Sequence, residues 1–222
     1  MESLWVATEF PNLERVAVEC PAVTSIAELS TIATLRKLFL GSDLSRKLSY
    51  EILLGLAIEA LTLTIRNSSD IHFIAQIKKL EWLSVANWPL EDFSSLSRLS
   101  CRRFQSRGGK AKSTAGLNVS ELIRGQCDLQ LSSRLQNLKD LDTMHLSVAE
   151  CPNVDFASLS SARNLKFLEI QSCRQLGSLS FVDNCPSLVV LEINDTRTTQ
   201  LDFLPLFPVS YTHLTLPTNR EV

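Results

Sequence analysis

The ten residues Asn164–Cys173, NLKFLEIQSC, hold the pattern that decides the fold, with apolar side chains at Leu165, Leu168 and Ile170. A single residue separates the last two, which is the alternation expected of a short half-buried strand. The same triplet recurs on both sides of this stretch. Its other copies are Leu13, Val16, Val18; Leu35, Leu38, Leu40; Ile58, Leu61, Leu63; Leu80, Leu83, Val85; Thr143, Leu146, Val148; and Leu188, Leu191, Ile193. The first four copies are separated by steps of 22, 23 and 22 residues, a period typical of a solenoid whose units bury their apolar faces against their neighbours.

A second apolar group follows each strand after a polar turn. Ile71, Ile74 and Ile77 form one such group, and their spacing of three suits a 3₁₀ turn or a short helix. We therefore expect each unit to consist of a strand, a turn and a short return. Stacking of the units would place the strands in one parallel sheet.

The opening stretch resembles a leucine-rich repeat, L-x-x-L-x-L-x-x-N/C, with Cys173 at the final position and Cys151 at its equivalent. The unit length, and returns such as LDFLPL at 201–206, are similar to the short internalin-like subclass. The resemblance implies an α/β solenoid, a horseshoe with a parallel concave sheet and short 3₁₀ or helical convex returns. Other copies depart from the pattern and carry Asp43, Arg66, Trp88 and Thr196 at the Asn/Cys position, so we expect only a partial polar ladder.

The chain divides into four segments by this period. We expect about four regular repeats over 1–101, irregular or degraded repeats with a basic loop over 102–141, and about three regular repeats over 142–208. The basic stretch Arg102–Ser113, RRFQSRGGKAKS, has no apolar period, which predicts either an inserted loop or a locally irregular repeat. Possible degraded triplets there are Cys101, Phe104, Ser106 and Gln126, Leu129, Leu131.

The two ends differ from the repeats. VSYTHLTLPT at 209–218 resembles the in-frame translation of a sequencing-library adapter, so we expect 209–222 to be a non-native tail and the natural protein to continue beyond Pro208. A genuine final strand through Tyr211, His213 and Leu214 is the alternative. The N-terminus has no basic segment followed by an apolar core, which predicts no secretory signal and a cytoplasmic location.

Composition excludes several classes of protein. A net charge of −2 gives no overall bias toward nucleic acid or membrane, and the longest apolar stretch, Ile52–Ile65, is too short to span a bilayer. The six cysteines follow the repeat and form no C-x-x-C metal pattern, so we expect buried reduced thiols. Trp88, at a turn, is expected to be packed.

No motif indicates catalysis, a metal or a cofactor. His72 is expected in a return and His145 on a strand, without a nucleophile at motif spacing. The Gly108-Gly109-Lys110 stretch lacks the first glycine of a phosphate loop, and Ala111 replaces its Ser or Thr. The acidic residues are scattered along the chain and form no paired set. We therefore expect a protein that is not an enzyme.

The concave surface is the remaining candidate site. Residues that flank the strand leucines would point away from the core and include unusually large aromatics for a solvated face. The predicted partner-binding residues are Phe39, Trp82, His145, Phe167, Glu169 and Glu192. They predict a protein-interaction module whose partner is another protein.

Other functions remain open from the sequence. The chain could be the recognition half of a larger enzyme, such as a ubiquitin-ligase-like effector or adaptor, or a structural spacer in a larger protein. Nucleic-acid binding through the basic residues of 102–112 is the least favoured reading, because such charges usually belong to a solvated segment. Those residues are Arg102, Arg103, Arg107, Lys110 and Lys112.

Overall fold

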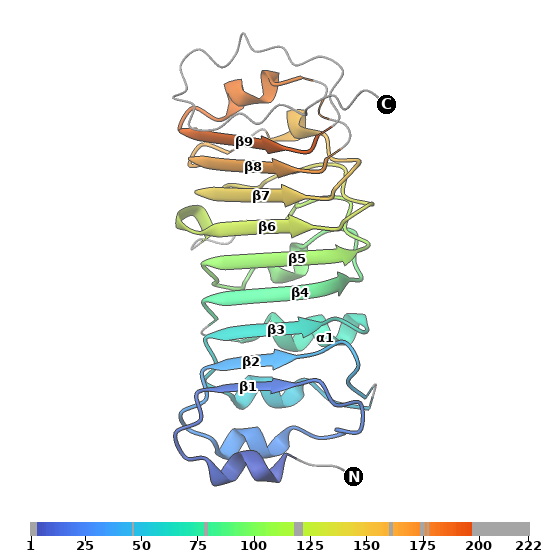
Figure 1. The fold of residues 1–222 in the computed structure, drawn as a ribbon, viewed down its shortest axis with the longest axis vertical. Coiled ribbons are helices and arrows are strands. Elements are labelled where there is room, and N and C mark those ends of the chain that lie inside the picture. Colours follow the sequence, from blue (N-terminus) through green and yellow to red (C-terminus); the bar gives the residue numbers. More distant parts are fainter. Residues whose placement is uncertain are drawn as a thin grey trace.

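The computed structural model of this chain describes residues 4–45, 47–77, 80–117, 122–159, 162–173, 176 and 178–196. Over this part the chain forms one open sheet of nine parallel strands that follow one another in sequence order (Figure 1). The strands are β1 (Arg15–Val18), β2 (Lys37–Leu40), β3 (Ala60–Thr64), β4 (Trp82–Trp88), β5 (Arg103–Gly109), β6 (Gln126–Gln130), β7 (His145–Ala149), β8 (Phe167–Gln171) and β9 (Val190–Asn194). This α/β arrangement is compatible with a solenoid.

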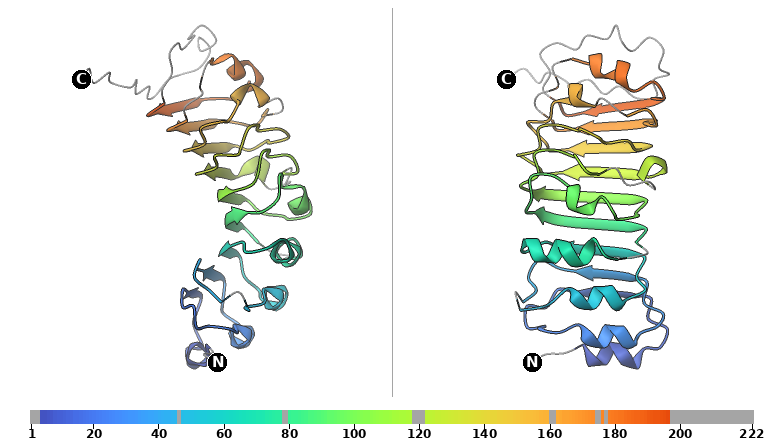
Figure 2. Two further views of the ribbon diagram at one scale, coloured as in Figure 1. Left: turned by 90° about the vertical axis from the view of Figure 1, so that its right-hand side faces the viewer. Right: turned by 180° about the vertical axis from the view of Figure 1, so that it is seen from behind.

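Short helices connect the strands and lie on one side of the sheet (Figure 2). The longest is the α-helix α1 (Ser68–Ile74), which begins at Asn67 with a capping box to Asp70. The others are 3₁₀ helices at Trp5–Glu9, Ala27–Thr31, Glu51–Gly55, Ser94–Leu96, Leu122–Arg124, Phe156–Ser158 and Ser180–Asn184. The returns are thus mostly 3₁₀ turns, as the spacing of three predicted.

The predicted triplet positions align from strand to strand. Leu38 of β2 pairs with Leu61 of β3, and Leu146 of β7 pairs with Leu168 of β8. Their side chains are buried, whereas the residues that alternate with them are half-buried or exposed, apart from the buried Ser147 and Ala149 of β7. Each strand therefore buries one face against the returns, and its other face points away from them.

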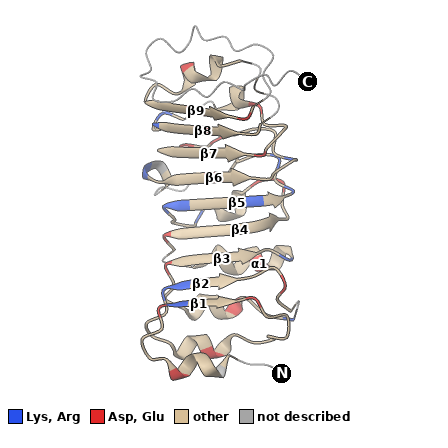
Figure 3. Cartoon of the chain, in the orientation of Figure 1, with Lys and Arg blue, Asp and Glu red and all other residues tan. Residues whose placement is uncertain are grey.

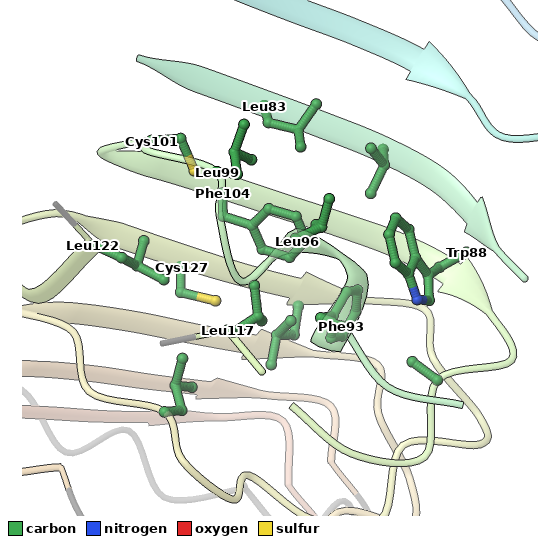
Figure 4. Close-up of a cluster of buried hydrophobic side chains, with 14 of the residues drawn as sticks. Leu83, Trp88, Phe93, Leu96, Leu99, Cys101, Phe104, Leu117, Leu122 and Cys127 are labelled. Atoms are coloured by element: carbon green, nitrogen blue, oxygen red, sulfur yellow. The ribbon is translucent and has the colours of Figure 1, made fainter. Parts of the chain in front are cut away.

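The core is mainly apolar and contains an aromatic cluster near its middle (Figure 4). The Phe93 ring lies 4.9 Å from the Trp88 ring and 5.2 Å from the Phe104 ring, measured between ring centres. Trp88 is fully buried, as predicted, and its indole Nε1 donates a hydrogen bond to the Asp92 carbonyl oxygen at 2.7 Å.

The basic stretch Arg102–Ser113 is not an inserted loop. Residues 103–109 form β5, which pairs in register with β4 on one side and β6 on the other. Phe104 and Ser106 are buried, which confirms the first of the two degraded triplets. The loop interpretation was wrong because a strand stabilised by ladder hydrogen bonds on both edges tolerates polar and glycine residues on its outer face.

The second degraded triplet was placed two residues too far along the chain. Cys127 and Leu129 are the buried residues of β6 and pair with Leu146 and Val148, whereas Leu131 is exposed at a positive φ of 52°. The described residues between β6 and β7 contain no helix, and Asn137 there forms isolated β-bridges. Cys127 and its partner Leu146 are 19 residues apart, which is fewer than in the regular copies.

Two buried cysteines that follow β7 and β8 contact backbone carbonyls. The Cys151 thiol donates to the Ala149 carbonyl oxygen at 3.3 Å, and the Cys173 thiol donates to that of Gln171 at 3.4 Å. All five cysteines other than the exposed Cys20 are buried, and none of the six forms a disulfide. The returns at 201–206 and the tail at 209–222 lie outside the described residues.

Candidate functional site: the open face of the sheet

No described element covers the face of the sheet that points away from the helices, and we call it the open face (Figure 2). Strand pairing aligns its side chains in rows across the nine strands. The first row contains Arg15, Lys37, Ala60, Trp82, Arg103, Gln126, His145, Phe167 and Val190. The middle row contains Ala17, Phe39, Thr62, Ser84, Gln105, Asp128, Ser147, Glu169 and Glu192.

The six predicted partner-binding residues all lie on these two rows. Trp82, His145 and Phe167 belong to the first row, and the middle row holds the remaining three, Phe39, Glu169 and Glu192. Trp82 and Phe167 keep 43% and 38% of their surface exposed, which is high for aromatic side chains on a strand.

The structure brings together only some of these residues. The rings of His145 and Phe167 stack with their centres 5.8 Å apart, and Glu169 and Glu192 are neighbours in register. Trp82 lies four strands from Phe167, about 19 Å at the usual spacing between strands. The aromatics therefore form two separate contact points on one face and not a single cluster.

A set of polar contacts in the middle of the face was not predicted. The Ser84 hydroxyl donates to Gln105 Oε1 at 2.8 Å, Gln126 Nε2 donates to Asp128 Oδ1 at 3.0 Å, and the Ser147 hydroxyl donates to a Glu169 carboxylate oxygen at 3.0 Å. The side chains are visible in the sequence, but which of them meet across strands depends on the pairing of β4 with β5 and of β7 with β8.

Asp128 is an acidic residue of this face whose pKa is shifted from its ordinary value. Partial burial raises the pKa of its carboxyl, and the hydrogen bond from Gln126 opposes that rise. Charged neighbours of opposite sign also act on the pKa of this carboxyl, since Arg103 lowers it and Glu169 raises it.

Two shallow hollows lie side by side on the open face. One has a volume of about 480 Å³ and follows the first row, with Trp82, Arg103 and His145 in its lining. The other has a volume of about 640 Å³ and follows the middle row and the ends of the strands. Phe39, Ser84 and Gln105 are among the residues that line it. Both are open depressions on the scale of peptide side chains.

The described residues offer little chemistry apart from binding. No three His, Cys, Asp or Glu side chains gather as a metal-ligand set within the described ranges. Burial raises the pKa of the Cys101 and Cys151 thiols to about 12, so at neutral pH they are protonated and poor nucleophiles. No helix in the described part of the chain is both long and apolar enough to cross a membrane.

Comparisons with known proteins add no family to this picture. The sequence matches no protein-family model, and a search of curated proteins finds no relative. The residues of the open face are therefore the basis of the functional proposal.

Proposed function

We propose that this chain is a leucine-rich-repeat solenoid of the short internalin-like type that works as a protein-interaction module. Its strands would form the concave side and its 3₁₀ returns the convex side. The alignment of apolar triplets across the strands supports this assignment, as do the cysteines that donate to backbone carbonyls at the Asn/Cys position.

The observation that carries the proposal is the exposure of Trp82 and Phe167 on a face that no described element covers. Tryptophan is among the residue types enriched at the energetic centres of protein interfaces, and aromatic side chains in general are enriched at interfaces. A sheet that is already ordered loses little conformational entropy when it binds, which favours affinity. The partner would contact the face at both aromatic points and at the polar residues between them.

The test compares variants in an affinity capture from extract of the source cells. The open-face variant combines Trp82→Ala with Phe167→Ala, and the control is Leu54→Ala, which removes a similarly exposed apolar side chain from a return. We expect wild type and the control to retain the same protein, and the open-face variant to retain about tenfold less. Circular dichroism and thermal melting verify that each variant is folded.

Two outcomes would contradict binding through the open face. If the folded open-face variant retains the same protein as wild type while Leu54→Ala loses it, the partner binds the returns and the proposal is wrong. Global unfolding of Trp82→Ala alone would also contradict it, because that tryptophan would then belong to the core.

A further inference from the structure

The charged residues of the strands are segregated by sign along the stack. Strands β1–β5 carry four charged side chains, all of them cationic: Arg15, Lys37, Arg103 and Arg107. Strands β6–β9 carry three formal charges, all of them anionic: Asp128, Glu169 and Glu192. All seven lie on the open face, and the blue ends of β5 mark two of the cations in Figure 3.

The hollow beside Trp82 lies mainly on the cationic half and extends to Gln126 of β6 and His145 of β7. Four cationic side chains line this hollow, namely Lys37, Arg102, Arg103 and Arg124. Its two carboxylates are Glu59 and Glu81, and Glu59 is already paired with Arg36 at 3.7 Å. The hollow thus combines an exposed aromatic side chain with an excess of positive charge.

We propose that this half of the open face binds an acidic polypeptide segment with an aromatic or apolar anchor. The anchor would pack on Trp82 in the hollow, and carboxylates on either side would pair with the cations of β1–β5. The anionic half would repel the same segment, which confines it to one end of the face and determines its orientation. This inference rests on the proposed interaction function and states the chemistry of the partner.

Nucleic acid fits this surface less well. A phosphate backbone that continued along the stack would meet Asp128, Glu169 and Glu192 beyond β5. The basic stretch 102–112 also offers a nucleic acid less positive charge than its sequence suggests, since Lys112 is paired with Glu91 at 2.6 Å. An acidic segment of a few residues can be held entirely within the cationic half.

The test is a titration with two short fluorescein-labelled peptides, in which glutamates or lysines flank one central tryptophan. Fluorescence anisotropy is measured at about 0.01 M and about 0.15 M salt, where the screening length falls from ~30 Å to ~8 Å. We expect the glutamate peptide to bind more tightly than the lysine peptide, and more weakly at the higher salt. Arg103→Glu should reduce its affinity about tenfold or more, and Glu169→Lys should increase it.

The matched control is Arg98→Glu, which makes the same change in net charge at an exposed arginine just after the Ser94–Leu96 helix, on the return side. An equal effect of Arg98→Glu and Arg103→Glu, equal affinity for the two peptides, or binding of neither would overturn the inference. Tighter, Arg103-dependent binding of a short DNA duplex would replace the acidic peptide with nucleic acid. None of these outcomes would contradict the proposed function. That function is tested separately by the capture experiment, which changes Trp82 and Phe167 and leaves the charged residues as they are.

Discussion

At the scale of the residue, Arg66 ties the segment before β3 to the residues that follow this strand. It stands where the leucine-rich-repeat pattern has Asn or Cys. Its guanidinium donates to the carbonyl oxygens of Ser45 and Leu48, both at 2.7 Å, and pairs with Asp70 at 3.4 Å. It also lies over the Tyr50 ring, 4.1 Å from its centre. The arginine therefore satisfies backbone carbonyls of the segment between β2 and β3.

Removal of this side chain should be costly. We expect Arg66→Ala to lower the free energy of unfolding by about 3 kcal/mol, because it removes the cationic partner of the nearly buried Asp70 and the side-chain donors to two carbonyls, while Asp70 keeps its backbone N–H donors. The control is Lys112→Ala, which breaks the shorter but solvated pair with Glu91 and should cost about 0–1 kcal/mol. Chemical denaturation measures both, and equal costs for the two variants would contradict the structural role of Arg66.

At the scale of the element, adjacent residues of one strand contribute differently to stability, because they point to opposite faces of the sheet. Leu168 of β8 is 1% exposed, whereas its neighbour Phe167 points to the open face. We expect Leu168→Ala to cost about 2–5 kcal/mol, from lost apolar burial and the cavity that remains. Phe167→Ala should cost less than about 1 kcal/mol, although it removes the larger side chain. The reverse order in urea unfolding would mean that the two faces are exchanged.

A close approach between the backbones of neighbouring strands makes a second prediction. Gly109 has a φ of 104°, and a Cβ placed there would overlap the backbone of Trp88 in the adjacent strand. We expect Gly109→Ala to destabilise the protein by about 2 kcal/mol or more. Gly55 provides the comparison, because its Cβ would meet nothing within 4 Å, and Gly55→Ala should be neutral or stabilising by about 0.4–1 kcal/mol. Thermal melts that show no difference between the variants would refute the close approach at Gly109.

At the scale of the whole molecule, buried thiols are distributed along the stack and should make it sensitive to alkaline pH. Burial raises the pKa of Cys151 from about 9 to about 12 and that of Cys185 to about 11, so the unfolded chain loses these protons first. The stability from the protonated thiols is complete below about pH 9 and is lost as the pH rises through 9–12. Each thiol contributes a fall of up to about 1.4 kcal/mol per pH unit.

The measurement is the free energy of unfolding from pH 7 to pH 10.5. Cys151→Ala should reduce the alkaline slope, whereas Cys20→Ser, which changes an exposed thiol, should leave it unchanged. Tyr50 adds to the effect at the upper end, since burial raises the pKa of its phenol to about 12. A stability that stays level over this range would show that the thiols are accessible to water in the native protein.

Local regularity explains which parts of the fold could be predicted. The triplets at Leu38, Leu61 and Leu168 alternate within a few residues, so the strands, their order and their buried faces were predicted from sequence. The strand at Arg103–Gly109 was predicted only as one alternative beside an inserted loop, because its polar residues are held by ladder bonds to β4 and β6, which no local pattern records. The register of β6 was missed for a related reason, since Cys127 pairs with Leu146 over a step of only 19 residues and only the folded sheet establishes that pairing.

The sequence by itself determined that this chain stacks short strands against short returns, because burial of alternate side chains is a local requirement of the chain. Only the tertiary structure decided how the outward side chains meet. Parallel pairing separated Trp82 from Phe167, joined His145 to Phe167, and collected scattered charges into a cationic half and an anionic half of one face. Those juxtapositions depend on registers between residues some 20 positions apart in the chain, and pairing in the folded sheet establishes them.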